Sequence, residues 1–446
     1  MTDSDSISGD FQGGGSNSHG SEMSPREHKQ SLDFGNNCNQ NSSEMVDKSR
    51  TGKVMNHIPD DLAFCVLSKL PLKSLKRFGC VCQTWSLLFE NSHFMSKFRT
   101  NFISHCHSDY IDTSLLLYQI IQSHDHTQYC SFYSLSGHRY ENRVKLDFPN
   151  PFQVENPRFY FFYCDTITGT ICLKFENTIV LWKPTTHEFK VIPPSPVQSG
   201  SPYRESQVFC HGFGYDPIRD DIKIITFTTF EKIDSRALQH LGVRREDVPW
   251  NELPFEPLWE IYSLRCNSWK KLDFDMPVCW FDNWSYERLY TEGVCHWWSN
   301  SVNRENVLVS FDLRTEMFFT TAIPLEIAPD TDPSHNFLFV ERRLAMLNGS
   351  IASILWYTTT FHISILGELG VKKSWTKLFV VGPLSNIERV VGTGKNGDIF
   401  FKTKDGKLVL LDLSTGIIED MSFKGGHGYD VAIFKENHIL MAGINF

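Results

Sequence analysis

The spacing of apolar residues changes twice along the chain and divides it into three parts. Residues 1–52 show neither helical nor strand periodicity and are rich in Ser, Gly and Asn. Such a segment cannot bury enough apolar surface to offset the entropy that ordering costs. We therefore expect a disordered tail at 1–52, a helical unit at 53–104 and a separate β-rich domain at 107–446.

The second part carries the apolar spacing of short helices. Leu62, Val66 and Leu70 recur at every fourth position, which places them on one helical face. Pro71 ends this helix, because proline has no amide for an inner turn. Two more short helices are expected, the last one ending before Asn91. Three short helices enclose a very small core, so the unit is expected to need a partner that covers its remaining apolar face.

The third part alternates short runs of Ile, Val, Phe, Thr and Tyr with Gly, Asp, Asn and Pro, which is typical of β-strands. A unit of strands and polar turns recurs at Thr166–Pro193, Glu292–Pro324 and Asn396–Met421. Each unit has an apolar face to bury, so neighbouring units must stack as propeller blades do. A kelch-like period of about 50 residues allows six or seven such units, and we expect an all-β propeller of about six blades. A pair of β-sandwiches is the alternative.

Turns and chain ends add detail to this propeller. The C-terminal run at 429–441 is expected to pair with early strands such as 113–121, because a closed ring leaves fewer exposed sheet edges. Polar tetrapeptides predict hairpin turns between outer strands. These tetrapeptides are Lys183–Thr186, Asp312–Thr315 and Asp412–Thr415.

Composition and charge limit the possible functions. The chain has 446 residues, 41% of them hydrophobic, with 35 Phe and 11 Trp that provide large apolar surfaces for packed sheets. A net charge of −9 disfavours nucleic-acid binding, which needs a basic face. No apolar run is long enough to predict a membrane helix. The first residues lack the apolar core of a secretion signal, so the twelve cysteines are expected to be reduced in the cytoplasm or nucleus.

No cluster of residues predicts catalysis. Cys80–Cys82 and His105–His107 contain metal-ligating residue types, but no second pair lies at zinc-finger spacing. Asp220–Asp221 is expected in a tight turn that binds backbone amides. Gly392–Gly397 has the glycine spacing of a dinucleotide loop, but a β-rich stretch follows where a helix is required. We therefore expect no enzyme activity, no cofactor and no metal site.

The helical part closely resembles the F-box of plant F-box proteins. The matching elements, in the family's order, are Ile58-Pro59, Asp60-Asp61, Leu70-Pro71, Ser74-Leu75, Arg77-Phe78 and Val81-Cys82-Gln83-Thr84-Trp85. The resemblance implies that this segment binds the Skp adaptor of a cullin-based ubiquitin ligase. The residues that it implies for the adaptor surface are Ile58, Pro59, Leu62, Val66, Leu70, Pro71, Leu75, Val81 and Trp85. Family members often carry a Glu near Phe64, an Arg at Gly79 and a Lys at Gln83, and these departures affect the polar rim of that surface.

The β-rich part resembles the F-box-associated domain of plant F-box proteins, including those related to the pollen S-locus type. The matching pieces stand in the family's order across residues 166–379: GTICL, LWKPTTHEFKVIP, GFGYDP with RDDIKII, EIYSLRCNSWKKL, GVCHWW, SFDLRTE and KKSWTKLF. The resemblance implies recognition of a protein target. Propellers usually bind through loops on one face, and the longest irregular stretch is Lys232–Pro257. Candidate target-binding residues in or beside it are Arg244, Arg245, Trp250 and Trp259.

Together, the two resemblances predict a tethering protein. One module docks on a ligase and the other captures a ligand, which raises the concentration of the target near the ubiquitin-loaded enzyme. The expected function is the substrate-recognition subunit of a Skp-cullin-F-box ubiquitin ligase, with the Skp adaptor, the cullin behind it and a protein target as partners. Two alternatives remain: a non-ligase F-box scaffold, and a propeller hydrolase, because Asp405-Gly406 is similar to the Asp-Gly turns of glycan-cleaving propellers.

Overall fold

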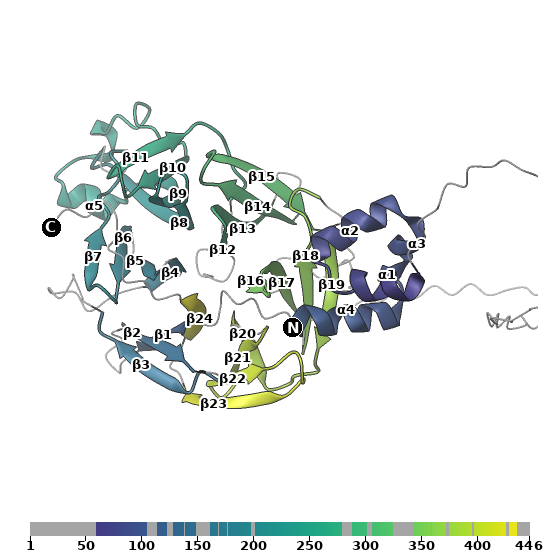
Figure 1. Ribbon diagram of the computed structural model, residues 1–446. Helices are drawn as coiled ribbons and strands as arrows, with labels where there is room; N and C mark the ends of the chain where they lie inside the picture. Colours follow the sequence, from purple (N-terminus) through teal and green to yellow (C-terminus); the bar gives the residue numbers. More distant parts are fainter. Residues whose placement is uncertain are drawn as a thin grey trace, which may run out of the picture. The chain divides into compact units, whose positions relative to one another are not determined.

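Figure 1 shows the structure, a computed structural model. It describes residues 59–104, 114–122, 128–137, 139–148, 161–167, 169–175, 177–197, 201–278, 288–300, 306–323, 342–357, 359–371, 374–394, 397–424 and 428–434. Contacts divide the chain into Met1–His57 and Ile58–Phe446. The tail expected at 1–52 lies outside the described residues. No helix that the structure describes has the length and apolar character to cross a membrane.

The helical unit contains four α-helices rather than three. They are α1 Asp60–Leu67, α2 Leu72–Val81, α3 Gln83–Ser86 and α4 Ser92–Ser104, with the 3-10 turn η1 Leu87–Phe89 after α3. The spacing correctly predicted the first two helices. The third is short and continues as a 3-10 turn. The expected end at Asn91 is the start of α4, because the Asn91 side chain accepts a hydrogen bond of 2.9 Å from the Phe94 amide and so caps that helix.

Six four-stranded antiparallel sheets follow, and each forms one blade of a propeller (Figure 1). Blade 1 contains β4 Phe161–Ile167, β5 Thr170–Phe175, β6 Thr178–Lys183 and β7 Glu188–Val191. Blade 2 contains β8 Arg204–Asp216, β9 Asp221–Lys232, β10 Leu258–Ser263 and β11 Ser268–Leu272. Blade 3 contains β12 Arg288–Thr291, β13 Val294–Asn300, β14 Asn306–Asp312 and β15 Met317–Ala322.

The other three blades complete the ring. Blade 4 contains β16 Arg342–Leu347, β17 Ser350–Tyr357, β18 Thr360–Leu366 and β19 Trp375–Val381. Blade 5 contains β20 Ile387–Thr393, β21 Ile399–Thr403, β22 Lys407–Leu411 and β23 Ile418–Lys424. Blade 6 joins the two ends of the domain: β24 Gly428–Phe434 lies beside β1 Ser114–Gln122, followed by β2 Gln128–Ser136 and β3 Asn142–Leu146. The predicted number of six blades is confirmed, and the sandwich alternative is wrong.

The predicted closure of the ring is also confirmed. β24 pairs with β1 in antiparallel register, with Leu115 opposite Ile433 and Leu117 opposite Val431. Leu115 and Leu117 pack with blade 5, whereas Leu116, between them, packs with blade 1. Successive side chains of a strand point to opposite faces of the sheet, so each blade buries both faces between two neighbours.

The aromatic residues fill the spaces between blades. Trp259 of blade 2 stacks on Trp297 of blade 3, with ring centroids 5.8 Å apart. The next residue in the chain, Trp298, points to the other side of blade 3 and stacks on Trp375 of blade 4 at 5.9 Å. Adjacent tryptophans in the GVCHWW motif therefore stabilise two different blade interfaces.

The hairpin between the third and fourth strands has a common form in four blades. Its last turn residue has a positive φ in each, although only blade 5 uses a glycine there. These residues are His187, Asn267, Glu316 and Gly416. In blade 5 the Asp412 side chain accepts hydrogen bonds from the Ser414 amide and hydroxyl, which stabilises the turn without help from neighbouring blades. The predicted polar turns are thus confirmed as connections between outer strands.

The helical unit contacts blade 4, at both of the turns on one end of that blade. Arg77 of α2 forms an ion pair with Glu368 of the β18–β19 loop, with an N···O distance of 2.5 Å. Asn348, in the β16–β17 turn, donates a hydrogen bond of 2.8 Å to the Phe102 carbonyl of α4. Buried side chains of the helices and of blades 4 and 5 form one apolar cluster. The chain itself therefore supplies part of the cover that the small helical core was expected to need.

Candidate interaction surfaces

An uncovered apolar surface lies on the helical unit. Leu62 and Val66, one turn apart on α1, are 55% and 50% exposed, and Val81 at the end of α2 is 84% exposed. Phe78 and Leu87 are exposed as well. We call these five residues the F-box surface. The adjoining side of α1 is apolar too, with Ala63 and Leu67 buried in the core. Helical spacing alone therefore does not show where the covered side ends and the exposed side begins.

The structure separates the residues that the resemblance implied for adaptor binding. Pro59 and Pro71 are exposed, like Leu62, Val66 and Val81, and Leu70 and Trp85 are half-buried against the core. The implied role of Leu75 in adaptor binding is wrong. Leu75 is completely buried in the core of the unit, where no partner reaches its side chain. Ile58 lies outside the described residues. Phe78 and Leu87 were not predicted, although Phe78 belongs to the quoted Arg-Phe element.

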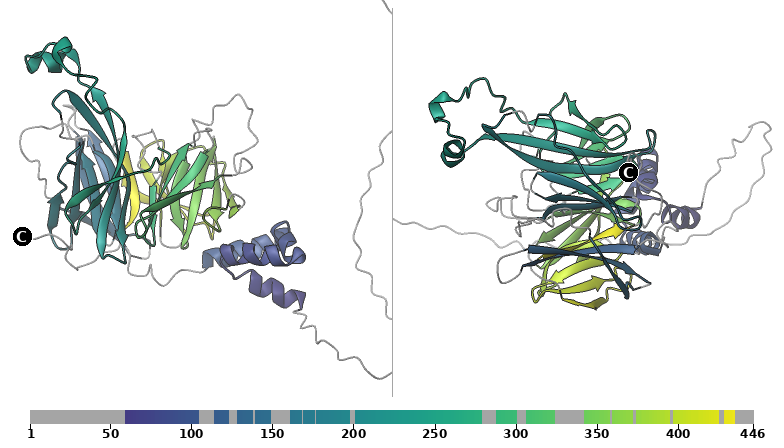
Figure 2. Two further views of the ribbon diagram at one scale, coloured as in Figure 1. Left: turned by 90° about the horizontal axis from the view of Figure 1, so that it is seen from above. Right: turned by 90° about the vertical axis from the view of Figure 1, so that its left-hand side faces the viewer.

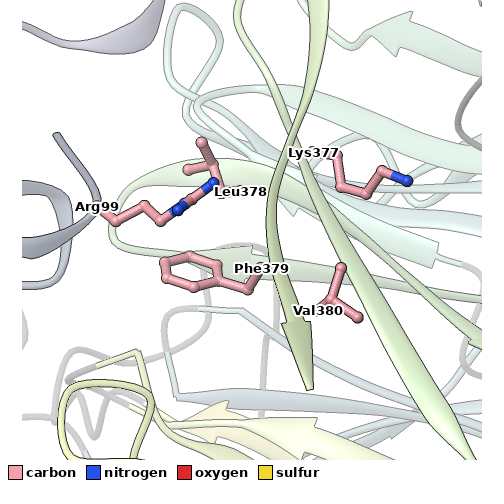
Figure 3. A pocket seen from close by; sticks show the side chains of 5 residues that line it. All are labelled: Arg99, Lys377, Leu378, Phe379 and Val380. Carbon is pink, nitrogen blue, oxygen red and sulfur yellow. The ribbon is translucent and has the colours of Figure 1, made fainter. Parts of the chain in front are cut away.

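A cavity of about 530 Å³ lies between α4 and strand β19 (Figure 3). Its lining contains Arg99 from α4 and the stretch from Lys377 to Val380. Figure 3 shows the Arg99 side chain directed at Leu378, while the Lys377 side chain points away from Arg99. The two cations therefore do not converge on a common point, and the cavity forms no anion site.

The second surface is an excursion between β9 and β10, the stretch Lys232–Pro257 that the sequence analysis singled out. It contains α5 Ser235–His240 and the 3-10 turn η3 Arg245–Asp247. The Asp234 carboxylate caps α5 by accepting a hydrogen bond of 2.7 Å from the Ala237 amide. The excursion also has its own buried residues, Leu238 and Val248. It is therefore a folded element.

Polar and aromatic contacts attach the excursion to blade 2. Trp250 donates from its indole nitrogen to the Arg245 carbonyl at 2.9 Å, and the Lys232 ammonium lies 5.1 Å from its ring centroid. Arg204, at the start of β8, donates to the Pro254 carbonyl at 2.6 Å and lies over the Phe230 ring. These contacts fix both the start and the end of the excursion.

The four candidate target-binding residues have different positions. Arg244 and Arg245 are exposed on the excursion, whereas Trp250 is half-buried and holds the excursion together. The prediction that Trp259 binds a target is wrong. Trp259 is only 2% exposed and packs between blades 2 and 3 against Trp297, so its ring is not accessible to a target. It follows the excursion in the sequence, but it is already part of β10 and its side chain faces blade 3.

The two surfaces lie at opposite ends of the propeller. In an antiparallel four-stranded blade, the first and third connections lie at one end and the second connection at the other. The helical unit contacts Asn348 and Glu368, in the first and third connections of blade 4. The excursion is the second connection of blade 2. Both views in Figure 2 show α5 on the side of the propeller away from α1–α4.

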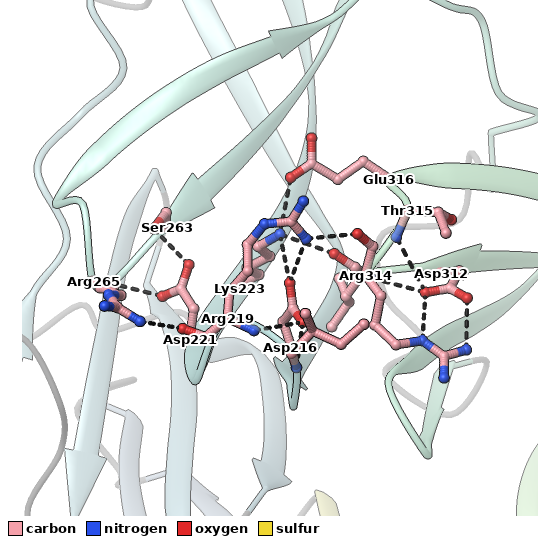
Figure 4. A network of polar contacts seen from close by, with 12 residues as sticks. Asp216, Arg219, Asp221, Lys223, Ser263, Arg265, Asp312, Arg314, Thr315 and Glu316 are labelled. Atoms are coloured by element: carbon pink, nitrogen blue, oxygen red, sulfur yellow. Dashed lines mark hydrogen bonds and ion pairs between the residues drawn. The ribbon is translucent and has the colours of Figure 1, made fainter.

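A network of polar contacts joins blades 2 and 3 (Figure 4). The Lys223 ammonium lies 3.0 Å from the Asp216 carboxylate and 2.9 Å from that of Glu316 in the next blade. Burial alone would raise the pKa of Asp216, but hydrogen bonds from Arg219 and Lys223 lower it. The charged groups of this network pair with one another, so the network has a structural role.

The predicted turn at Asp220–Asp221 belongs to the same network. Asp221 accepts hydrogen bonds from the Arg265 amide at 2.8 Å and from the Ser263 hydroxyl at 2.5 Å, so its expected binding of a backbone amide is confirmed. Asp220 accepts instead from the Tyr215 hydroxyl, at 2.6 Å. Neither carboxylate lies in a cleft between two catalytic groups.

Histidine and cysteine side chains are candidate metal ligands, but the buried His296 is held instead by hydrogen bonds within blade 3. His296 lies between Thr291 and Ser310, 3.0 and 2.9 Å from their hydroxyl oxygens, and burial lowers its pKa to about 3. The described parts of the chain contain no group of three or more His, Cys, Asp or Glu side chains arranged to hold a metal. Cys80–Cys82 is described and belongs to no such group, whereas His105–His107 lies outside the described residues.

Comparison with known proteins agrees with this architecture. The family called F-box associated beta propeller domain matches residues 116–439, and the F-box domain family matches residues 55–97. An F-box protein of Arabidopsis thaliana is 30% identical over 171 residues, which are 38% of this chain and 40% of that protein.

Two longer alignments cover most of the chain. F-box/WD-40 repeat-containing protein 1 of Arabidopsis thaliana is 25% identical over 73% of this chain and 68% of its own length. An F-box/kelch-repeat protein of the same plant is 22% identical over 81% of this chain and 86% of its own. Because the propeller family matches most of the chain, this protein belongs to the plant F-box proteins with an F-box-associated β-propeller domain.

Proposed function

We propose that this protein is a substrate-recognition subunit of a Skp-cullin-F-box ubiquitin ligase. The F-box surface binds the Skp adaptor, and through it the cullin, while the propeller binds a protein target. The observation that carries the proposal is the F-box surface itself: Leu62, Val66 and Val81 are uncovered, although apolar residues elsewhere in the same helices are buried. Large apolar side chains that no other part of the chain covers are typical of a site of protein interaction.

The arrangement of the two surfaces supports a receptor role. The F-box surface belongs to the helices that contact one end of the propeller, and the excursion extends from the other end. A target bound at the excursion therefore leaves the F-box surface free for the adaptor. The protein acts by bringing the target near the ubiquitin-loaded enzyme and carries out no chemical step itself. We place it in the cytoplasm or nucleus, where such ligases have their targets.

A double substitution tests adaptor binding. Leu62→Asp with Val81→Asp places two charges on the F-box surface without touching the core, so the protein should fold normally. Co-purification with a Skp-type adaptor should fall at least about tenfold, since buried apolar anchors dominate such interfaces. The matched control is Val144→Asp, because Val144 is 58% exposed on β3 of the propeller and should leave the yield of adaptor unchanged. Undiminished adaptor in the double variant would reject the proposal.

Ubiquitin transfer separates a ligase receptor from a non-ligase scaffold. With the chain, adaptor, cullin and ubiquitin-loaded enzyme combined, proteins captured by the propeller should gain ubiquitin, and their half-lives should lengthen when the chain is removed from cells. Captured proteins that bind the propeller, receive no ubiquitin and keep their half-lives would favour the scaffold.

A further inference from the structure

The arginines of the excursion differ from those in the rest of the propeller. Arg219, Arg314 and Arg343 each form an ion pair with an aspartate. Other described propeller arginines contact a carboxylate, a backbone carbonyl or an aromatic ring, or have another interaction within the chain. Examples are Arg139, Arg143, Arg204, Arg265 and Arg389.

In the described part of the chain, no ion pair or hydrogen bond engages the guanidinium groups of the excursion. This holds for Arg236, Arg244 and Arg245, all of which are exposed. Glu246 and Asp247 directly follow Arg245 in the chain, but neither of their carboxylates pairs with it. The stretch Lys232–Pro257 contains four Lys and Arg residues and five Asp and Glu residues, so the unpaired arginines do not make the excursion basic as a whole.

Two of these arginines line a cavity. Its volume is about 310 Å³, and its lining combines Arg244 and Arg245 with apolar groups from Leu238 and Val243. Ser235, Gln239 and Gly242 complete the lining, and no acidic side chain belongs to it. Arg236, although unpaired and close in sequence, does not line the cavity.

The shape of this site is fixed before a ligand arrives. Leu238, which lines the cavity, is only 3% exposed, so its side chain is held by the packing of the excursion. The Arg245 carbonyl accepts the indole hydrogen bond of Trp250, which holds the backbone of the arginine pair in place. A preorganised site loses less conformational entropy when it binds.

We propose that this cavity is the target-binding site and that it recognises an anionic segment of a protein, in which a carboxylate or phosphorylated side chain lies next to an apolar one. Guanidinium groups bind such anions through paired, charge-assisted hydrogen bonds. The apolar neighbour packs against the half-buried Val243 in the lining of the cavity. The inference deepens the proposed receptor function and rests on it for its biological meaning, whereas the binding event itself involves only the excursion.

Peptide binding to the purified full chain tests the inference, and it does not require the adaptor to be bound. The probes are three pools of short fluorescent peptides. Each peptide has a pair of identical residues at its centre, directly beside a leucine. The pair is two glutamates in the first pool, two phosphoserines in the second and two glutamines in the third. The glutamate or phosphoserine pool should bind, with affinity that falls as salt is added, and the better of the two identifies the anion. The glutamine pool should bind at least about tenfold more weakly.

Three variants locate the site. Arg244→Ala with Arg245→Ala should weaken binding of the anionic pool about tenfold or more, because two charge-assisted contacts are lost. Arg245→Lys keeps the charge but loses the paired geometry, so it should weaken binding by a smaller factor. Arg236→Ala is the matched control, which removes an equal unpaired charge outside the cavity and should change affinity by less than about twofold.

Two results would overturn the inference: anionic pools that bind no better than the glutamine pool, or equal affinity in the Arg244/Arg245 double variant. All three arginines are exposed, so an unchanged unfolding temperature is expected and verifies folding. Failure of peptide binding leaves adaptor co-purification intact and rejects only this site. Failure of the adaptor test instead rejects the receptor function and leaves the peptide result standing.

Discussion

The F-box surface and the blade interfaces are built from the same kinds of apolar side chain, but only the blade interfaces are covered by the chain. Leu62 on α1 is 55% exposed, whereas Leu308 in blade 3 is fully buried between two neighbouring blades. A blade always has a neighbour on each face, while the helical unit has the propeller on one side only. Substitutions at covered positions of the ring should therefore change stability, and substitutions on the F-box surface should change binding alone.

The ring closure should show the largest effect. Val431 of β24 is 2% exposed and packs against blade 5, so Val431→Asp buries a charge without a partner. The free energy of unfolding should fall by about 4 kcal/mol or more, measured by urea denaturation, or the variant should fail to fold. Val144→Asp, on an exposed outer strand, should change it by less than about 0.5 kcal/mol. Equal midpoints for the two variants would contradict the distinction between covered and uncovered positions.

The polar network between blades 2 and 3 should show an intermediate effect. Lys223 is 3% exposed and lies between Asp216 and Glu316, so Lys223→Met leaves two carboxylates near each other without their shared cation. A loss of about 3 kcal/mol is expected in denaturant unfolding at neutral pH. Lys270, which pairs with the same Glu316 but is 68% exposed, is the matched control and should cost under about 1 kcal/mol as Lys270→Met.

The same variant has a defined pH dependence. Hydrogen bonds from Lys223 help to hold the pKa values of Asp216 and Glu316 below their ordinary values. A lowered carboxyl pKa stabilises the folded state above the ordinary value and loses that contribution as the pH falls through the folded value. The difference between wild type and Lys223→Met should therefore shrink below about pH 4. A difference that stays constant on acidification would show that lost packing, rather than charge, causes it.

The smallest expected effect is a gain in stability, not a loss. Glu260 is 2% exposed in blade 2, and burial raises its pKa in spite of a hydrogen bond from Ser195. A raised carboxyl pKa costs stability as the pH rises through the folded value, because the folded state then holds a buried charge. Glu260→Gln should raise the urea midpoint at pH 8 and leave it nearly unchanged at pH 4. An equal or lower midpoint at pH 8 would mean that the charged carboxylate is stabilising.

Several elements of this fold were predictable because short-range physics specifies them. The closure of the ring followed from the need to cover sheet edges, and the pairing of β24 with β1 agrees with it. The polar turns before His187 and Gly416 followed from turn chemistry. The predicted break at Asn91 is present, since α3 and η1 end at Phe89, but the helix α4 that the Asn91 side chain caps was not predicted.

The direction of single side chains was harder to predict. Leu75 and Trp259 were assigned to surfaces but are buried, since α2 and β10 have apolar residues on both faces and the pattern does not distinguish a covered face from an open one. Conversely, Arg244 and Arg245 are exposed, but the stretch around them that was predicted to be irregular contains α5 and η3. Their cavity was not predictable, because it depends on how α5 folds back beside them.

The sequence by itself determined the order of the modules and indicated a propeller of about six blades that closes through its two ends, because repeated patterns and turn residues depend on a few neighbouring positions. Only the tertiary structure decided which apolar faces remain open and which charges lack partners. The GFGYDP-RDDIKII segment and the SFDLRTE motif lie far apart in the chain, yet Lys223 of the first pairs with Asp216 in its own segment and with Glu316 of the second. Burial and charge pairing depend on which segments meet in space, and no local pattern records that.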